Sequence, residues 1–173
     1  FVLDDGWFGE RNDDSAGLGD YSENLKKLPR GVREISDYAH KNGLKFGLWI
    51  EPEMVNENSD LFRAHPDYII SANGLPPCKG RNQYVLDLSR KDVREYIAEN
   101  VIAAIKRNNA DYVKWDMNRS LTDLYSSELK ERSKELKHRY VLGLYDLSER
   151  ITQALPNVFF EGCASGGCRF DAG

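Results

Sequence analysis

Side chains that could take part in catalysis follow four short apolar runs of the sequence. They are Asp4 and Asp5 after the first run, Trp49 and Glu51 at the second, Lys114 and Asp116 at the third, and Glu161 and Cys163 at the fourth. If these runs are parallel strands, their carboxyl ends meet at one edge of a sheet, where parallel α/β folds place their sites. Carboxylates and lysines hydrogen-bond sugar hydroxyls, aromatic rings stack on sugar C–H faces, and a carboxylate can attack an anomeric carbon. The pattern therefore predicts a site suited to sugars.

Asp116 is the strongest single candidate for a catalytic group. Lys114 and Asp116 alternate with Trp115 at the period of a strand, so both face the same side of the sheet and their charges can pair. A cation beside Asp116 would keep its carboxyl ionised, as a nucleophile requires. The alternative is an ion pair with a purely structural role.

The other candidates also have structural explanations. Asp4 and Asp5 could cap a loop. Adjacent residues of a strand point to different sides, so at most one of the two acids lies on the strand face that carries the site. Cys163 could be a small buried residue and Trp49 a packing residue. Arg81 could be an ordinary surface charge. Residue types alone leave these alternatives open.

Metal and cofactor sites are not expected. The histidines and cysteines are too scattered for a zinc site and form no C-x-x-C pair: His40, His65 and His138, with Cys78, Cys163 and Cys168. Gly166 and Gly167 lack the spacing of a dinucleotide-binding loop, and the sequence holds no P-loop. We therefore predict neither a metal ion nor a cofactor.

Strands and helices are expected to alternate along the chain. Apolar runs predict strands at residues 1–3, 44–50, 111–116 and 158–161, and helical spacing predicts helices near residues 29–41, 90–107 and 140–155. Ser89 and Asp92 resemble a capping box at the start of the second helix. Residues 54–80 read as irregular, residues 81–88 as a short extended segment, and residues 118–137 as a loop with an exposed helical piece. Alternation of this kind indicates right-handed βαβ units, a parallel sheet and an α/β fold.

The composition excludes several classes of protein. The 173 residues include 24 Lys+Arg against 28 Asp+Glu, a net charge of −4, which disfavours a nucleic-acid binder. The 40% of hydrophobic residues is enough for a core, yet no apolar run approaches the roughly 18 residues that a membrane helix needs. An odd, sparse set of 3 cysteines is typical of reduced thiols in a cytoplasmic protein. The chain opens as if inside a strand and closes as if inside a loop, which predicts an incomplete domain.

Five motifs in order resemble one enzyme family. They are residues 4–8 (DDGWF), 47–54 (GLWIEPEM), 112–119 (YVKWDMNR), 138–145 (HRYVLGLY) and 163–167 (CASGG). Together they resemble the retaining alpha-galactosidases of glycoside hydrolase family thirty-six, the melibiase type of bacteria. The resemblance implies a (β/α)8 barrel, of which residues 1–173 would hold strands two to five, truncated at both ends. It also implies removal of terminal alpha-linked galactose from oligosaccharides such as melibiose and raffinose.

The same resemblance implies roles for particular residues. Asp116 matches the nucleophile, and Asp4 and Asp5 match the pair that binds the galactose O4 and O6 hydroxyls. Further galactose-site positions match, and they are Trp49, Lys114 and Arg81, with Cys163 and Gly166 near O2. The family's acid/base lies beyond Gly173, so Asp171 is not assigned that role. We therefore expect this chain to carry the nucleophile without its partner acid.

Three positions depart from the family pattern and keep alternatives open. Gly162, Cys168 and Tyr21 stand where the family often has Ser, Gly and Trp. The first two flank the O2 side, so an alpha-N-acetylgalactosaminidase or a galactosyl transferase remains an alternative. An inactive galactose-binding fragment is another. The expected partner is a galactosyl oligosaccharide, with no nucleic acid and no membrane, and a homo-oligomeric parent is one option.

Overall fold

Parallel strands joined by helices form the centre of the structure. The computed structural model describes residues 1–164. Its elements in chain order are β1 (Val2–Leu3), α1 (Gly31–Lys41), β2 (Gly47–Ile50), β3 (Met54–Asn56), α2 (Asp60–Ala64), η1 (Pro66–Tyr68), β4 (Gln83–Val85), α3 (Lys91–Arg107), β5 (Tyr112–Trp115), η2 (Lys130–Glu135), α4 (Leu136–Ala154) and β6 (Phe159–Gly162).

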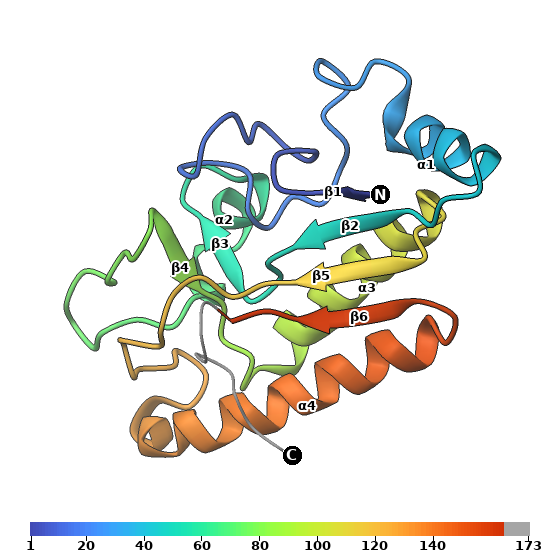
Figure 1. Cartoon of the computed structure of the whole chain (residues 1–173). Coiled ribbons are helices and arrows are strands. Elements are labelled where there is room, and N and C mark those ends of the chain that lie inside the picture. The colour runs from blue at the N-terminus through green and yellow to red at the C-terminus, as the bar shows by residue number, and fades with distance from the viewer. Residues whose placement is uncertain (165–173) are drawn as a thin grey trace.

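All strands of the main sheet run parallel to one another. Within residues 1–164 its order is β1-β2-β5-β6, and every neighbouring pair is parallel. Trp49 pairs with Lys114, which in turn pairs with Glu161. The four arrows point the same way in Figure 1, toward the loops that carry α2, β3 and β4. The prediction of an α/β fold with a parallel sheet is confirmed.

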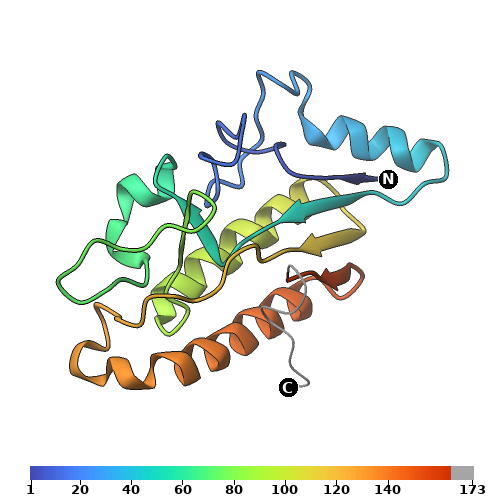
Figure 2. The same ribbon diagram turned by 60° about the vertical axis from the view of Figure 1, so that its left-hand side comes forward.

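The helices cover one face of this sheet. Figures 1 and 2 both show α3 behind β2 and β5, and α4 running along β6. Leu48 and Val113 are fully buried in the core, while Tyr112 and Lys114, which alternate with Val113 along β5, are only half-buried. The core is completed by apolar side chains of the helices, among them Val93, Val101, Ile105, Leu147 and Ile151. The period-two pattern of β5 thus separates a packing face from the face that carries Lys114.

The segment between β2 and α3 is more ordered than its sequence suggests. Residues 54–80 were expected to be irregular, which is wrong in part, because they contain β3, α2 and η1. β3 pairs antiparallel with β4, which confirms the short extended segment predicted within residues 81–88. The side chain of Ser59 caps α2 by accepting a hydrogen bond from Phe62 N at 3.0 Å. Elements of three to five residues are too short to show a hydrophobic periodicity in the sequence, so they could not be predicted from it.

The three long helices lie where they were predicted, but the capping box is wrong. The N-cap of α3 is Arg90, which makes no capping hydrogen bond with its side chain. Ser89 Oγ instead donates to Oδ1 of Asp87 at 2.5 Å. Asp87 is fully buried, and a buried carboxylate without a hydrogen bond is costly. The hydroxyl of Ser89 therefore bonds Asp87 instead of capping the helix.

Close contact between α4 and the backbone after β4 requires a glycine at position 143. A β-carbon there would lie 1.9 Å from the carbonyl oxygen of Leu88. The same oxygen accepts a hydrogen bond from Arg94 Nη1 at 2.8 Å, and Arg94 Nε donates to Asp146 of α4 at 2.7 Å. Gly143 therefore lets α3, α4 and the β4–α3 connection meet at one point.

We expect Gly143→Ala to lower the free energy of unfolding by about 1–3 kcal/mol, because the added methyl must displace backbone. The higher helix propensity of alanine stabilises the variant by about 1 kcal/mol. A net loss of stability therefore shows that the clash with the Leu88 carbonyl outweighs helix propensity. Urea unfolding of the complete gene product measures it. Leu142→Ala on the same helix, at a side chain that is 50% exposed, is the control and should change stability by less than about 0.5 kcal/mol. A stabilised Gly143→Ala variant would contradict the contact.

Asp111 ties α1 to the start of β5. Its carboxylate accepts hydrogen bonds from Phe46 N at 2.9 Å and Lys45 Nζ at 3.1 Å, and Oδ2 lies 2.6 Å from Nε2 of His40. Burial raises the pKa of Asp111, but the hydrogen bonds from Phe46, His40 and Lys45 outweigh burial and bring the pKa from 3.8 to about 2.

The lowered pKa predicts a pH dependence of stability. The stabilisation by Asp111 is fully present above pH 4, roughly its unfolded pKa, and is lost as the pH falls toward its folded value. Asp111→Asn should therefore be less stable than the parent at neutral pH, and the difference should shrink steadily through this acidic window. Urea unfolding at a series of pH values measures the difference between the two proteins. A difference that stays constant with pH would show that the ionised carboxylate is not the stabilising group.

Candidate active site

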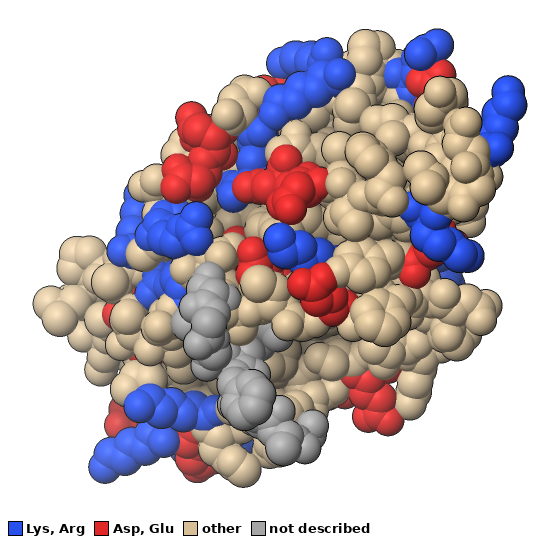
Figure 3. Space-filling view, in the orientation of Figure 1, with Lys and Arg blue, Asp and Glu red and all other residues tan. Residues whose placement is uncertain are grey.

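The predicted reactive residues meet at one edge of the sheet, which we call the C-terminal edge: the carboxyl ends of β1, β2, β5 and β6 and the residues directly after them. Lys114 Nζ lies 3.4 Å from Asp4 Oδ2, and Trp49 Nε1 lies 3.1 Å from Asp116 Oδ2. Backbone hydrogen bonds extend the ladder past the strand ends, from Asp116 N to Ile50 O and from Cys163 N to Trp115 O, both at 2.8 Å. Figure 3 shows acidic and basic side chains together over this part of the sheet.

Asp116 is buried and surrounded by donors. Its side chain accepts from Trp49 Nε1 at 3.1 Å and Asn118 Nδ2 at 2.8 Å on Oδ2, and from Met117 N at 2.9 Å on Oδ1. Burial alone raises the pKa of Asp116. Hydrogen bonds from the side chains of Asn118, Cys163 and Trp49 and from Met117 N reverse this and leave the pKa below its ordinary value. The geometry therefore favours a carboxylate at neutral pH.

The expected ion pair between Lys114 and Asp116 is wrong. In the part of the chain that the structure describes, the ion pair of Lys114 is with Asp4. Leu3 pairs with Leu48 and Trp49 with Lys114, so Asp4 continues β1 at the level of Lys114. Asp116 lies two residues after Lys114, directly beyond the end of β5. Neutral donors, rather than the neighbouring cation, dominate the environment of Asp116.

Arg11 holds Asp5, a contact that the sequence did not predict. The guanidinium donates from Nε to Asp5 Oδ1 at 2.5 Å and from Nη1 to Ala16 O at 2.9 Å and Asn56 Oδ1 at 3.1 Å. It is 5% exposed, whereas the side chain of Asp5 is 40% exposed. Arg11 therefore fixes one oxygen of Asp5 and leaves the carboxylate accessible. A single arginine in a polar loop carries no motif that could have revealed this contact.

Trp49 serves both packing and the site. Its ring stacks on Phe8 with centroids 6.2 Å apart, and the Arg11 guanidinium lies 5.9 Å from its centroid. Its indole N–H points at Asp116, and its backbone carbonyl accepts from Trp7 Nε1 at 2.9 Å. At 3% exposure the indole offers little open ring surface, so its contact with the site is through Nε1.

Arg81 and the residues near the C-terminus complete the predicted set. Arg81 is exposed, at a positive φ of 52°, and no contact within residues 1–164 joins it to Asp116 or Lys114. Its loop is held by the buried Arg119, whose Nη1 donates to Cys78 O and Gln83 O, both at 2.8 Å.

Cys163 is half-buried and hydrogen-bonds Asp116. Gly166, Cys168 and Asp171 lie outside the described residues.

Glu51 is a second buried carboxylate beside Asp116. It is 1% exposed, and its Oε1 accepts from Asn118 N at 2.6 Å and Gln83 Nε2 at 2.7 Å. Oε2 accepts from Asn118 Nδ2 at 3.1 Å. Burial raises the pKa of Glu51, and the charge of Asp116 adds to this. The hydrogen bonds from Asn118 and Gln83 oppose the rise but leave the pKa of Glu51 above its ordinary value. The sequence predicts Glu51 at this edge of the sheet but indicates no role for it.

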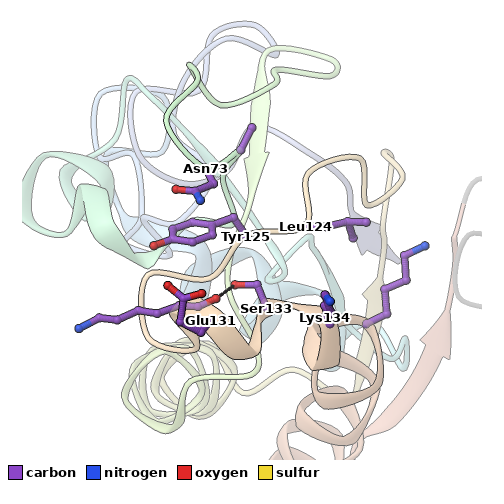
Figure 4. Close-up of a pocket in the computed structure, with 9 residues that line it drawn as sticks. Asn73, Leu124, Tyr125, Glu131, Ser133 and Lys134 are labelled. Atoms are coloured by element: carbon purple, nitrogen blue, oxygen red, sulfur yellow. Dashed lines mark hydrogen bonds between the residues drawn. The ribbon is translucent and has the colours of Figure 1, made fainter.

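A separate hollow lies away from this cluster. It has a volume of about 730 Å³ and is lined by Ala72, Asn73, Leu124, Tyr125, Lys130, Glu131, Ser133, Lys134 and Lys137. Figure 4 shows Asn73 and Tyr125 on one side and Glu131, Ser133 and Lys134 on the other. None of these residues belongs to the group around Asp116.

Comparison with known proteins decides the family. A family model described as Melibiase matches residues 1–173. The chain belongs to the melibiase family. It is 52% identical over its whole length to alpha-galactosidase Mel36A of Lactobacillus acidophilus, and 50% identical over 99% of its length to alpha-galactosidase AgaA of Geobacillus stearothermophilus. It spans 24% of the length of each of these relatives.

Solved structures of alpha-galactosidases share the fold. The alpha-galactosidase of Lactobacillus brevis superposes with a TM-score of 0.95 at 52% identity, over 99% of this chain and 23% of that one. A variant of AgaA in complex with raffinose, assigned to glycoside hydrolase family thirty-six, matches with a TM-score of 0.95 at 50% identity, over 98% of this chain and 24% of that one. The resemblance to this family is confirmed, and the four parallel strands with their helices are part of an α/β barrel.

The part of the chain that the structure describes contains neither a candidate membrane span nor a candidate metal site. Among the described residues, no helix is both long and apolar enough to span a membrane. Within the same residues, no group of three or more His, Cys, Asp or Glu side chains could hold a metal ion.

Proposed function

We propose that the protein carrying this melibiase-family chain is a retaining alpha-galactosidase. Its substrates would be oligosaccharides that end in alpha-linked galactose, of the melibiose and raffinose type. Membership of the family supports the reaction class. The observation that carries the assignment is the buried Asp116, held by donors at the C-terminal edge with a lowered pKa. We keep the cytoplasm as its proposed location, on the cysteine usage of the sequence.

The proposed mechanism is a double displacement. An oxygen of Asp116 attacks the anomeric carbon, and the bond from that carbon to the leaving oxygen breaks as the new ester bond forms. The leaving oxygen takes a proton from a second carboxylic acid, which we place outside this chain. That second group then removes a proton from water, and the water attacks the anomeric carbon and releases Asp116. Each displacement inverts the configuration of the anomeric carbon, so the two steps together retain it.

The galactose would be held by the charged residues around Asp116. Asp4 and Asp5 both keep accessible carboxylates, with side chains 64% and 40% exposed, and would accept hydrogen bonds from the O4 and O6 hydroxyls. Lys114, already oriented by Asp4, would donate to a sugar oxygen. Cys163 and Gly166 would border O2, and Arg81 would approach only if its loop bends toward the sugar.

Asp116→Asn in the complete gene product should abolish hydrolysis of an aryl alpha-galactoside, because an amide cannot form the glycosyl ester. Asp116→Ala supplied with azide should regain activity and yield the beta-galactosyl azide, since azide replaces the missing nucleophile from the same face. Product stereochemistry by NMR distinguishes this from simple recovery of hydrolysis.

Asp111→Asn is the matched control, since it removes an acid at the opposite end of β5. It should keep its turnover at neutral pH under conditions where the variant is folded. Near-normal hydrolysis by Asp116→Asn would refute the nucleophile. Faster hydrolysis of the aryl alpha-N-acetylgalactosaminide than of the aryl alpha-galactoside would refute the proposed substrate.

A further inference from the structure

Asn118 joins two buried carboxylates through one nitrogen. Its Nδ2 donates to Asp116 Oδ2 at 2.8 Å and to Glu51 Oε2 at 3.1 Å. Its backbone N donates to Glu51 Oε1 at 2.6 Å. Glu51 therefore holds both the backbone and the side chain of the residue that donates to Asp116.

Glu51 is itself fixed in place. It is 1% exposed, and Gln83 of β4, which is 2% exposed, donates from Nε2 to Oε1 at 2.7 Å. Both oxygens of Glu51 are thus occupied by donors and closed to solvent, so Glu51 is not placed to exchange a proton with a substrate. Its contact with the reaction is through Asn118.

An ionised carboxylate can only accept hydrogen bonds. Because Glu51 and Asp116 lie on both sides of the Asn118 amide, only its nitrogen can face them. If the amide turned over, its oxygen would face Asp116 and repel the carboxylate. The orientation of Asn118 therefore depends on Glu51 offering an acceptor and no donor.

We propose that Glu51 is a positioning residue for Asp116. Acting through Asn118, it keeps a donor on Oδ2 of Asp116, which Trp49 also contacts, and so fixes the orientation of the attacking carboxylate. It also helps to keep Asp116 ionised in the free enzyme. The inference rests on the proposed role of Asp116 as nucleophile.

Glu51→Gln in the complete gene product tests the proposal. The single oxygen of the new Gln would accept from Asn118 N and Gln83 Nε2, so its NH2 would face Nδ2 of Asn118. The amide of Asn118 would then turn or move away, and Asp116 would lose a donor. The acidic limb of kcat/KM, which reports the free enzyme, should then move to higher pH. Turnover at the optimum should fall about 10- to 100-fold through misplacement of the nucleophile, with a smaller change in KM.

The direction of the shift separates two causes. Loss of the negative charge of Glu51 would by itself move the acidic limb to lower pH, because like charges raise each other's pKa. Glu51→Asp keeps the charge and withdraws the carboxylate by one methylene, so it should also move the limb to higher pH. It serves as the second variant if Glu51→Gln does not fold. An unchanged or downward limb in the folded variants overturns the proposal.

Coupling between residues provides an independent measurement. Asn118→Ala should shift the limb upward as well, and the double variant Glu51→Gln/Asn118→Ala should be no worse than the more damaged single variant, since both act on one contact. Additive losses would overturn the proposal. Asp87→Asn is the matched control: it removes another fully buried carboxylate, whose side chain bonds Ser89, and should leave the limb in place.

The azide experiment on Asp116→Ala keeps this inference distinct from the proposed function. Without azide rescue, the nucleophile assignment fails, and this inference fails with it. With rescue, an unshifted limb in the position 51 variants overturns the role of Glu51 alone.

Discussion

The parallel register of β1, β2, β5 and β6 is the constraint on which the rest of the structure depends. Because all strands run in one direction, every strand end delivers its next residues to the same edge. The pairing of Trp49 with Lys114 sets the level at which Asp4 meets Lys114, and the next step of the ladder brings Asp116 to the end of β2. A shift of β5 by one residue would turn Lys114 toward the helices and bury its charge.

The alternation of strands and helices could be predicted from the sequence, because it depends on local periodicity. The convergence of Asp4, Trp49, Lys114 and Asp116 at one edge followed from that order without any contact being known. The partners of these groups did not follow. Arg11 reaches Asp5 across a loop, and Asn118 reaches Glu51 across 67 positions of the chain, so both contacts depend on tertiary geometry. The capping box failed for the same reason, since Ser89 bonds a carboxylate whose burial no local pattern reveals.

Buried charge around the site is stabilised mainly by hydrogen bonds. Glu51 accepts three of them from Asn118 and Gln83, and Asp116 is held by an indole, an amide, a thiol and a backbone N–H. Each donor sits on an element that is anchored elsewhere: Trp49 is packed against Phe8, and Gln83 belongs to β4. The short β3–β4 pair, which the sequence concealed, is thus part of the support of the site. A displacement of this pair would reach Asp116 through three hydrogen bonds, which join Gln83 to Glu51, Glu51 to Asn118 and Asn118 to Asp116.

The two acids at opposite ends of β5 show why the kind of partner matters. Asp111 and Asp116 both have lowered pKa values, yet Asp111 is paired with Lys45 and His40, whereas Asp116 is surrounded by neutral donors. A cation in direct contact stabilises a carboxylate but also withdraws charge from it, which suits a structural tie. A nucleophile must keep its electron pair available while remaining ionised. Neutral donors meet both needs, since they lower the pKa of Asp116 without pairing its carboxylate with a cation. The chemistry of Asp116 therefore depends on the kind of group that contacts it as much as on its burial.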